Sequence, residues 1–257
     1  MDKRLEEFKR LLDVMDELRA KCPWDKEQTM ESLRHLTIEE TYELADSILE
    51  GKYQDIKKEL GDILLHIVFY AKIASEQKQF DITDVISGIC DKLIFRHPHV
   101  FGTVEVQNSD DVKNNWENLK IKEGNKSILA GVPVSLPSLV KAHRIQDKVR
   151  SVGFDWDDRT QIWNKVDEEL YELRQEFESG DAKKMEAEFG DLLFSLVNAA
   201  RLYNIDPEMA LERTNKKFIK RFNYLESQTL KKGKSLKDMT LAEMDVYWEE
   251  AKKQDGV

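Results

Sequence analysis

Acidic residues recur in this chain at a spacing that suits metal binding. The segment 168–201 contains E-E-x-x-E, and an E-x-x-D begins sixteen residues after its last Glu. Residues three positions apart share a helix face, so Glu169 and Glu172 project together, as do Glu188 and Asp191. Clustered carboxylates repel one another unless cations lie between them. Because oxygen ligands without His or Cys suit Mg²⁺, Mn²⁺ or Ca²⁺, the spacing predicts a divalent-cation site.

The same pattern occurs a second time. Residues 39–72 (the first repeat) align with 168–201 (the second repeat) at a constant offset of 129, with 12 of 34 positions identical. The matching acidic residues are Glu39, Glu40, Glu43, Glu59 and Asp62. A single E-x-x-E is usually a solvated helix face. Here, however, the second acidic pair of each repeat leads into an apolar run that must be largely buried, where charges need partners. Repetition therefore favours two sites over incidental surface charge.

Basic and aromatic residues follow each repeat in a fixed order, first K-x-x-x-R and then W-x-x-x-K. Lys and Arg four residues apart lie on one helix face and suit phosphate oxygens, whereas an indole face suits stacking on a base. A core Trp beside a surface Lys is the plainer alternative. The residues are Lys217, Arg221, Trp248 and Lys252 after the second repeat, and Lys92, Arg96, Trp116 and Lys120 after the first.

Two further lysines distinguish the second repeat from the first. Lys165 and Lys184 each lie four residues before a predicted ligand, and they correspond to Leu36 and Asp55 in the first repeat. Both are placed to reach a bound phosphate, although Lys184 is equally able to form an ordinary helix pair with Glu188. The second repeat is therefore the better candidate for a polyphosphate site.

The elements that must position these residues are helices. Only 11 Gly and 5 Pro occur among 257 residues, and the apolar residues recur at helical spacing. We expect helices near 29–50, 54–79, 83–95, 109–123, 137–150, 160–179, 182–204, 207–229 and 240–253, after an amphipathic first segment. Gly180 is expected to end one helix and reverse the chain. The stretch GVPVSLP at 131–137 is the best linker, which gives domains 1–130 and 131–257.

Composition excludes several classes of function. The chain has 40 basic and 50 acidic residues and no basic stripe, so it is not expected to bind a nucleic-acid polymer. Cys22 and Cys90 form no disulfide or zinc pattern. The N-terminal segment lacks the apolar run of a signal peptide, and the longest apolar stretch, 63–71, is too short to span a membrane. No His follows a Glu by three residues, which disfavours a di-iron bundle. We expect a cytoplasmic protein.

Several motifs together resemble one family. EETYE with ELGD, EELYE with EFGD, the stretch CPWDKEQT and the stretch RHPHVF resemble the MazG family of tandem-domain nucleoside triphosphate pyrophosphohydrolases. The resemblance covers nearly the whole chain. It implies an all-α fold of two homologous helical bundles and a homodimer. It also implies Mg²⁺-dependent cleavage of nucleoside triphosphates to monophosphates and pyrophosphate, with catalysis in the C-terminal domain.

The resemblance also assigns roles to residues. It implies that Glu169, Glu172, Glu188 and Asp191 hold Mg²⁺, for which Mn²⁺ is a possible substitute, and that Glu168 orients the attacking water or touches the nucleotide. Ala187 departs from the pattern, since some members carry Glu there. Lys165, Lys184, Lys217, Arg221 and Lys252 are expected to contact the triphosphate, and Trp248 the nucleoside. Broad base specificity and a role in nucleotide-pool housecleaning are expected; the alternative is a nucleotide-sensing module with little turnover.

Overall fold

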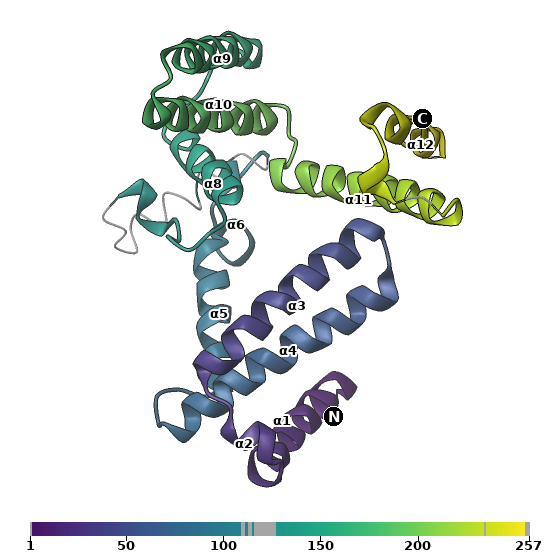
Figure 1. Cartoon of the computed structure of the whole chain (residues 1–257). Coiled ribbons are helices and arrows are strands. Elements are labelled where there is room, and N and C mark those ends of the chain that lie inside the picture. Colours follow the sequence, from purple (N-terminus) through teal and green to yellow (C-terminus); the bar gives the residue numbers. More distant parts are fainter. Residues whose placement is uncertain (1, 109–110, 113–114, 116–126, 234, 255–257) are drawn as a thin grey trace. The chain divides into compact units, whose positions relative to one another are not determined.

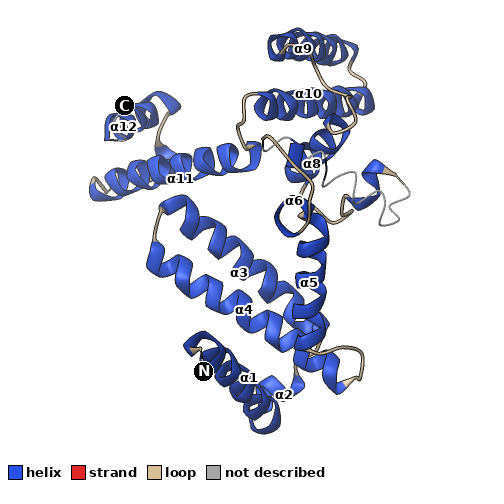
Figure 2. Cartoon of the chain, turned by 180° about the vertical axis from the view of Figure 1, so that it is seen from behind, coloured by secondary structure: helices blue, strands red, loops and turns tan. Residues whose placement is uncertain are grey.

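The computed structural model describes residues 2–108, 111–112, 115, 127–233 and 235–254, and over these ranges it contains helices and loops but no strand (Figures 1 and 2). The all-α class predicted from the sequence is confirmed. The chain divides into two compact units, Met1–Val106 and Gln107–Val257. The expected linker at 131–137 lies inside the second unit. Just before it, Ile128–Gly131 forms a 3-10 helix whose Ile128 carbonyl accepts a hydrogen bond from Lys148.

The first unit is built around two long helices joined by a tight turn. Its helices are α1 (Lys3–Lys21), α2 (Pro23–Glu27), α3 (Met30–Glu50), α4 (Tyr53–Glu76), α5 (Ile82–Arg96) and α6 (Pro98–Phe101). Helices α3 and α4 lie side by side, and α1 packs against α4 (Figure 1). Met15, Leu33, Val68, Phe69 and Ile73 form the buried core of these three helices. Burial of that apolar face fixes how α3 meets α4.

The second unit repeats this hairpin. Its helices are α8 (Ser138–Arg150), α9 (Ile162–Ser179), α10 (Ala182–Leu202), α11 (Pro207–Lys231) and α12 (Leu241–Gln254), with 3-10 turns at Arg159–Gln161 and Leu236–Asp238. Helices α9 and α10 form the hairpin, α8 packs against α10, and α12 packs against α11 (Figure 1). Ile162, Val166 and Ala199 form the core between α9 and α10. The helix predictions are thus confirmed in the described ranges, whereas most of 109–123 lies outside them.

A left-handed glycine makes each hairpin turn. Gly51 follows α3 with φ +66°, and Gly180 follows α9 with φ +76°. Residues with a Cβ rarely adopt this conformation. After Gly180, the Asp181 carboxylate accepts hydrogen bonds from the backbone N–H groups of Lys183 and Lys184 and starts α10. The predicted reversal at Gly180 is confirmed, and it is what turns two acidic segments toward each other.

The stretch CPWD, at residues 22–25, leads into a short helix. Pro23 begins the short helix α2, because a proline at the first helical position loses no hydrogen bond and has a preset φ. No helix in the described ranges is long and apolar enough to cross a membrane.

We predict that Gly180→Ala lowers the free energy of unfolding by about 1 kcal/mol, because an L side chain is strained at positive φ. A Cβ at Gly180 meets no atom within 4 Å, so the loss isolates backbone strain. Gly190→Ala is the matched control. It lies within α10, also in open space, and should raise stability by up to about 1 kcal/mol. Urea denaturation measures both, and equal stabilisation by the two substitutions would contradict the turn assignment.

Candidate functional site

The α9–α10 hairpin brings three of the four predicted ligands together. Glu169 and Glu172 lie one turn apart on α9, and Glu188 faces them from α10. One carboxylate oxygen of each lies within 4.8 Å of the others. The Glu169 side chain is almost fully buried, Glu188 is half-buried and Glu172 is exposed. The site therefore has an inner end at Glu169 and an outer end that opens to solvent.

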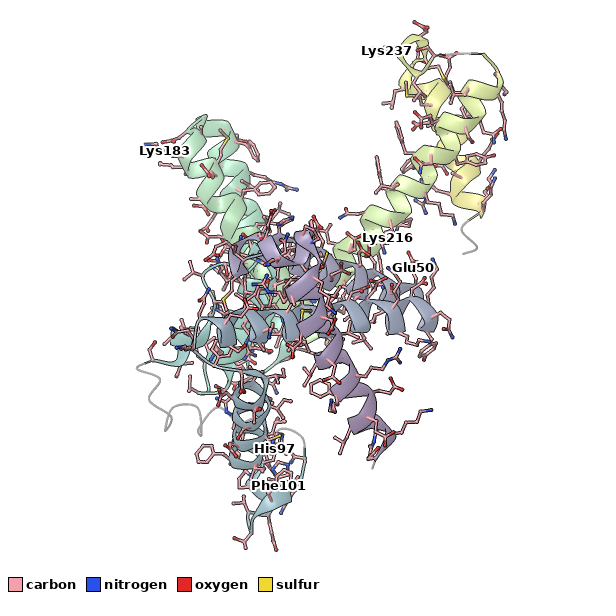
Figure 3. All side chains as sticks on the ribbon, turned by 90° about the horizontal axis from the view of Figure 1, so that it is seen from below. Glu50, His97, Phe101, Lys183, Lys216 and Lys237 are labelled. Carbon is pink, nitrogen blue, oxygen red and sulfur yellow. The ribbon has the colours of Figure 1, made fainter. Side chains whose placement is uncertain are left out.

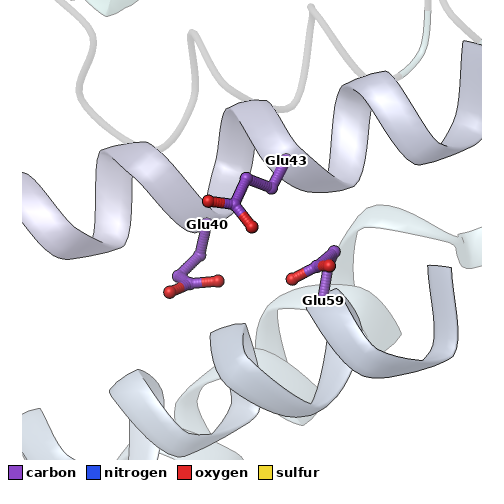
Figure 4. Close-up of side chains that lie close together, drawn as sticks. All are labelled: Glu40, Glu43 and Glu59. Carbon is purple, nitrogen blue, oxygen red and sulfur yellow. The ribbon is translucent and has the colours of Figure 1, made fainter. Parts of the chain in front are cut away.

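The first repeat builds the same arrangement. Glu40 and Glu43 on α3 face Glu59 on α4, again with one oxygen of each within 4.8 Å of the others (Figure 4). Glu59 is buried as Glu169 is, although it comes from the other helix of the hairpin. Two segments with 12 of 34 identical residues thus each bring three carboxylates together.

Asp191, the fourth predicted ligand, is not in the group of three. It lies one helical turn after Glu188 and lines a cavity together with Lys165 and Glu169. Its charge still acts on the cluster, since it contributes to the raised pKa of Glu188. Asp62 occupies the corresponding position in the first repeat, within 3.9 Å of the Lys58 ammonium.

The pKa of one glutamate in each cluster is raised by burial and by neighbouring carboxylates. Partial burial, followed by the charges of Glu172 and Asp191, raises the pKa of Glu188 above its ordinary value. Partial burial, followed by the charges of Asp62 and Glu43, raises the pKa of Glu40 in the same way. A carboxylate that is harder to ionise beside other carboxylates is the expected behaviour of a cation site without its cation.

The donor set fits a hard divalent cation. Three carboxylates from two helices converge within the reach of one ion, and none of the converging ligands is a sulfur or an imidazole nitrogen. Mg²⁺ and Mn²⁺ prefer such oxygen ligands. Glu169, Glu172 and Glu188 could therefore hold a metal ion, and Asp191 lies one helical turn after Glu188.

Lysines neutralise part of each cluster, at different positions. In the second repeat, Lys165 Nζ lies 2.8 Å from oxygens of both Glu168 and Glu169. In the first repeat, Lys58 Nζ lies 3.2 Å from Glu59. Ala187 is the counterpart of Lys58 at the offset of 129, so the second cluster has no ammonium on that side of α10.

Lys184 has a different partner from the one expected as its helix pair. Its Nζ lies 3.9 Å from Glu176, across the turn on α9, and not beside Glu188. The reason is that the reversal at Gly180 brings the start of α10 next to the end of α9. A sequence-local pairing rule does not account for such a contact.

The predicted cations and tryptophan of the C-terminal segment form their own group. The Arg221 guanidinium lies 5.8 Å from the centre of the Trp248 ring, Phe218 lies 4.9 Å from the same ring, and Lys252 pairs with Glu249. Lys217 lies on α11 next to Lys216, which Figure 3 shows well apart from Lys183 at the α9–α10 turn. Within one chain, these residues are separated from the acidic cluster.

The equivalent residues of the first unit are only partly described. Lys92 and Arg96 lie four residues apart on α5, as predicted. Trp116 and Lys120 lie outside the described residues. The proposed grouping of all four therefore stays a prediction.

Sequence reasoning missed a buried ion pair beside the site. Arg201 on α10 donates to both carboxylate oxygens of Asp155, one of them at 3.0 Å, and also to Asn198. In the sequence, only the position of Asp155 in the GFDW stretch, shortly before the second repeat, offered a signal. The pair anchors this loop against α10.

The chain matches known proteins along most of its length. Residues 28–101 and 159–225 match the MazG nucleotide pyrophosphohydrolase domain, and these segments contain both acidic repeats. The protein named nucleoside triphosphate pyrophosphohydrolase/pyrophosphatase MazG of Thermotoga maritima is 43% identical over 253 residues, which is 96% of each chain. The nucleoside triphosphate pyrophosphohydrolase of Escherichia coli K12 is 39% identical over 262 residues, covering 98% of this chain and 99% of the relative.

A further relative is the uncharacterized protein YabN of Bacillus subtilis, 46% identical over 255 residues, which is 97% of this chain and 52% of the relative. The twofold domain match defines a tandem MazG-domain protein. The chain belongs to the MazG nucleotide pyrophosphohydrolase family, as the motifs predicted.

We predict that Glu188→Gln stabilises the metal-free protein and weakens its stabilisation by Mg²⁺. The folded-state pKa of Glu188 is raised, so folded protein binds more protons than unfolded protein between the ordinary and the raised value, and stability falls as pH rises through that window. The glutamine side chain of the variant cannot ionise, so the variant does not lose stability in this window. Mg²⁺ at about 100 times its dissociation constant should add about 2.7 kcal/mol to the wild type and less to the variant.

Thermal denaturation with Mg²⁺ or with chelator measures both effects. Glu186→Gln, an exposed position on the same helix, is the control and should change neither quantity. If Glu188→Gln destabilises the metal-free protein, repulsion within the cluster is not the dominant interaction there.

Proposed function

We propose that the second repeat hydrolyses nucleoside triphosphates to nucleoside monophosphates and pyrophosphate, using Mg²⁺. The observation that carries this proposal is the convergence of Glu169, Glu172 and Glu188 within 4.8 Å, in a chain of the MazG family. Two relatives that align over nearly the full chain are named for this reaction. Release of pyrophosphate from a mixed triphosphate pool, with and without Mg²⁺, tests it directly.

The acidic cluster needs a cation before it can accept a polyanion. Bound Mg²⁺ would offset the charge of the triphosphate and acidify a water molecule. Glu169, Glu172, Glu188 and Asp191 would hold the metal. Mn²⁺ is the expected substitute, because it takes the same oxygen ligands.

We assign Glu168 and Lys165 to proton and phosphate contacts. Glu168 is half exposed, lies outside the group of three ligands, and pairs with Lys165 at 2.8 Å. We assign it the proton of the attacking water. Hydrogen bonds to Glu168 and then Glu169 raise the pKa of Lys165, so its ammonium stays charged and is available for a phosphate oxygen. Lys184, near the Gly180 turn of the hairpin, is assigned a similar contact.

The remaining predicted phosphate contacts require a second molecule. Lys217, Arg221 and Lys252 lie on α11 and α12, whereas the acidic cluster lies on α9 and α10 (Figure 1), and we infer that a partner chain supplies these contacts. Exposed apolar side chains on α10 and α11 support the expected homodimer, because such a surface favours a protein partner. They include Phe189, Leu196, Phe218 and Ile219.

The first repeat is the candidate for binding with little turnover. Its cluster also joins three carboxylates, but the Lys58 ammonium lies beside Glu59 on α4, where the second repeat has Ala187 at the position of Lys58. It also lacks a counterpart of Lys165, since Leu36 stands there. We therefore assign it a sensing or structural role, and we place hydrolysis in the second repeat. Broad base specificity, a housecleaning role and cytoplasmic location complete the proposal.

We predict that Glu172→Ala lowers turnover by about 10²-fold or more, because one of three converging metal ligands is lost while an exposed residue leaves the fold unchanged. Calorimetry should show weaker Mn²⁺ binding, and circular dichroism an unaltered helical spectrum. Asp191→Ala should have the same direction of effect. Wild-type rates of pyrophosphate release in Glu172→Ala would refute the ligand assignment.

We predict that the matched first-repeat substitution, Glu43→Ala, lowers turnover by less than about threefold, because the first cluster does not carry the reaction. Glu40→Ala should behave alike. Steady-state kinetics on the full chain makes the comparison, with Glu172→Ala measured alongside. Equal losses in the two repeats would show that both are catalytic.

A further inference from the structure

The acidic cluster of the first unit has a positive charge of its own. Lys58 Nζ lies 3.2 Å and 3.5 Å from the two carboxylate oxygens of Glu59, and 3.9 Å from an oxygen of Asp62. These two carboxylates lie one helical turn apart on α4, so one ammonium lies beside both members of the E-x-x-D pair. Because Mg²⁺ binds carboxylate oxygens at about 2.0–2.1 Å, an ion on Glu59 would lie within about 6 Å of this ammonium.

The charge of Lys58 acts on acidic residues of both helices in the hairpin. The hydrogen bond to Glu59, followed by the charges of Glu59, Asp62 and Glu43, raises the pKa of Lys58. Burial and the neighbouring carboxylates raise the pKa of Glu40, and Lys58 opposes that rise. The Lys58 side chain is exposed whereas that of Glu59 is buried, so the ammonium reaches the cluster from the solvent side.

The second unit carries its positive charge elsewhere. Ala187 occupies the position of Lys58 at the offset of 129. The ammonium of this cluster comes from Lys165, which contacts Glu169 on the facing helix, α9. Among the described residues, no ion pair joins Lys165 to either of the predicted acidic ligands on α10. The E-x-x-D pair of the second unit therefore has no ammonium beside it.

An ammonium and a divalent cation compete for the same carboxylates. At about 6 Å, the repulsion between a single and a double positive charge in bulk water corresponds to about tenfold in affinity, and a lower effective dielectric near the protein surface increases it. The lysine also differs from a free ion in one respect. Because it is covalently attached, it stays beside Glu59 at every metal concentration and offsets part of the repulsion in the cluster.

We infer that Lys58 is a tethered cation that takes the place of the divalent metal in the first unit and keeps Mg²⁺ out of its acidic cluster. The inference rests on the proposed function, since it takes the second cluster as the metal site. It restricts the two cation sites predicted from the sequence to one, and it favours the structural role of the first unit over the sensing role. Position 58 and its counterpart 187 then determine which hairpin takes a metal.

The first experiment removes the tethered charge in a chain whose second cluster is disabled. Mn²⁺ is titrated by calorimetry into full-length Glu172→Ala, and into Glu172→Ala that also carries Lys58→Met. Methionine keeps most of the side-chain length without the charge, so the double variant should bind Mn²⁺ about tenfold more tightly, or better. Lys58→Arg keeps the charge, and in the same background it should leave Mn²⁺ affinity within about twofold of Glu172→Ala.

The neighbouring lysine provides the matched control. Lys57 is exposed, and among the described residues no ion pair joins it to the cluster. In the Glu172→Ala background, Lys57→Met should therefore leave Mn²⁺ affinity within about twofold. Lys58→Met alone, in the otherwise unchanged chain, should also leave pyrophosphate release within about twofold, because the first cluster does not carry the reaction. Both lysines are exposed, so circular dichroism should show unaltered helical spectra.

The reciprocal experiment moves the charge to the second unit. Ala187 is exposed on α10, so a longer side chain fits there without displacing the core. Ala187→Lys should weaken Mn²⁺ binding by about tenfold, whereas Ala187→Met, which adds similar bulk without charge, should stay within about twofold of the wild type. Pyrophosphate release by Ala187→Lys should fall at low Mg²⁺ and recover as the Mg²⁺ concentration is raised.

Three outcomes overturn the inference: no gain in Mn²⁺ affinity from Lys58→Met, an equal gain from Lys57→Met, or equal losses from Ala187→Lys and Ala187→Met. Failure of the proposed function has a separate signature. In that case, the wild-type chain releases no pyrophosphate with Mg²⁺, whereas the comparison of Lys58→Met with Lys57→Met measures binding alone and still decides the inference.

Discussion

Repulsion between carboxylates on two facing helices is the constraint on which the rest of the structure depends. Glu169, Glu172 and Glu188 approach within 4.8 Å because α9 and α10 also bury Ile162, Val166 and Ala199 between them. Apolar burial thus holds together groups that would separate if they were free. The folded protein retains this unfavourable contact between carboxylates. A divalent cation would relieve it, so the arrangement that favours cation binding also lowers the stability of the metal-free fold.

The turn geometry converts this constraint into a site. Gly51 and Gly180 both adopt positive φ directly after the first helix of their hairpins. Because the chain reverses at this glycine, the number of residues from the glycine to each acidic residue determines which acidic residues of the two helices face each other. The spacing between the acidic residues and the glycine is the same in both units, whereas the neighbouring side chains differ. The spacing along the chain therefore determines which carboxylates converge.

Much of this was predictable from the sequence, and the reasons are local. Helical periodicity, scarce Gly and Pro, and E-x-x-E spacing act within one or two turns, so the helices and the convergence of Glu172 with Glu188 followed from them. The partner of Lys184, the buried pair of Asp155 with Arg201, and the cavity depend on which helices pack together. No pattern in one sequence encodes those contacts, because they join residues 8 to 46 positions apart.

Duplication explains why the differences between the repeats are informative. Since both hairpins keep three converging carboxylates, the substitutions around them can be compared position by position. Lys58 places an ammonium beside Glu59, whereas the second repeat has Ala187 at that position and takes its ammonium from Lys165 on the facing helix. An ammonium on α9 leaves the α10 side open toward Asp191 and the cavity. The two related units therefore differ in which helix of the hairpin carries the ammonium beside the cluster.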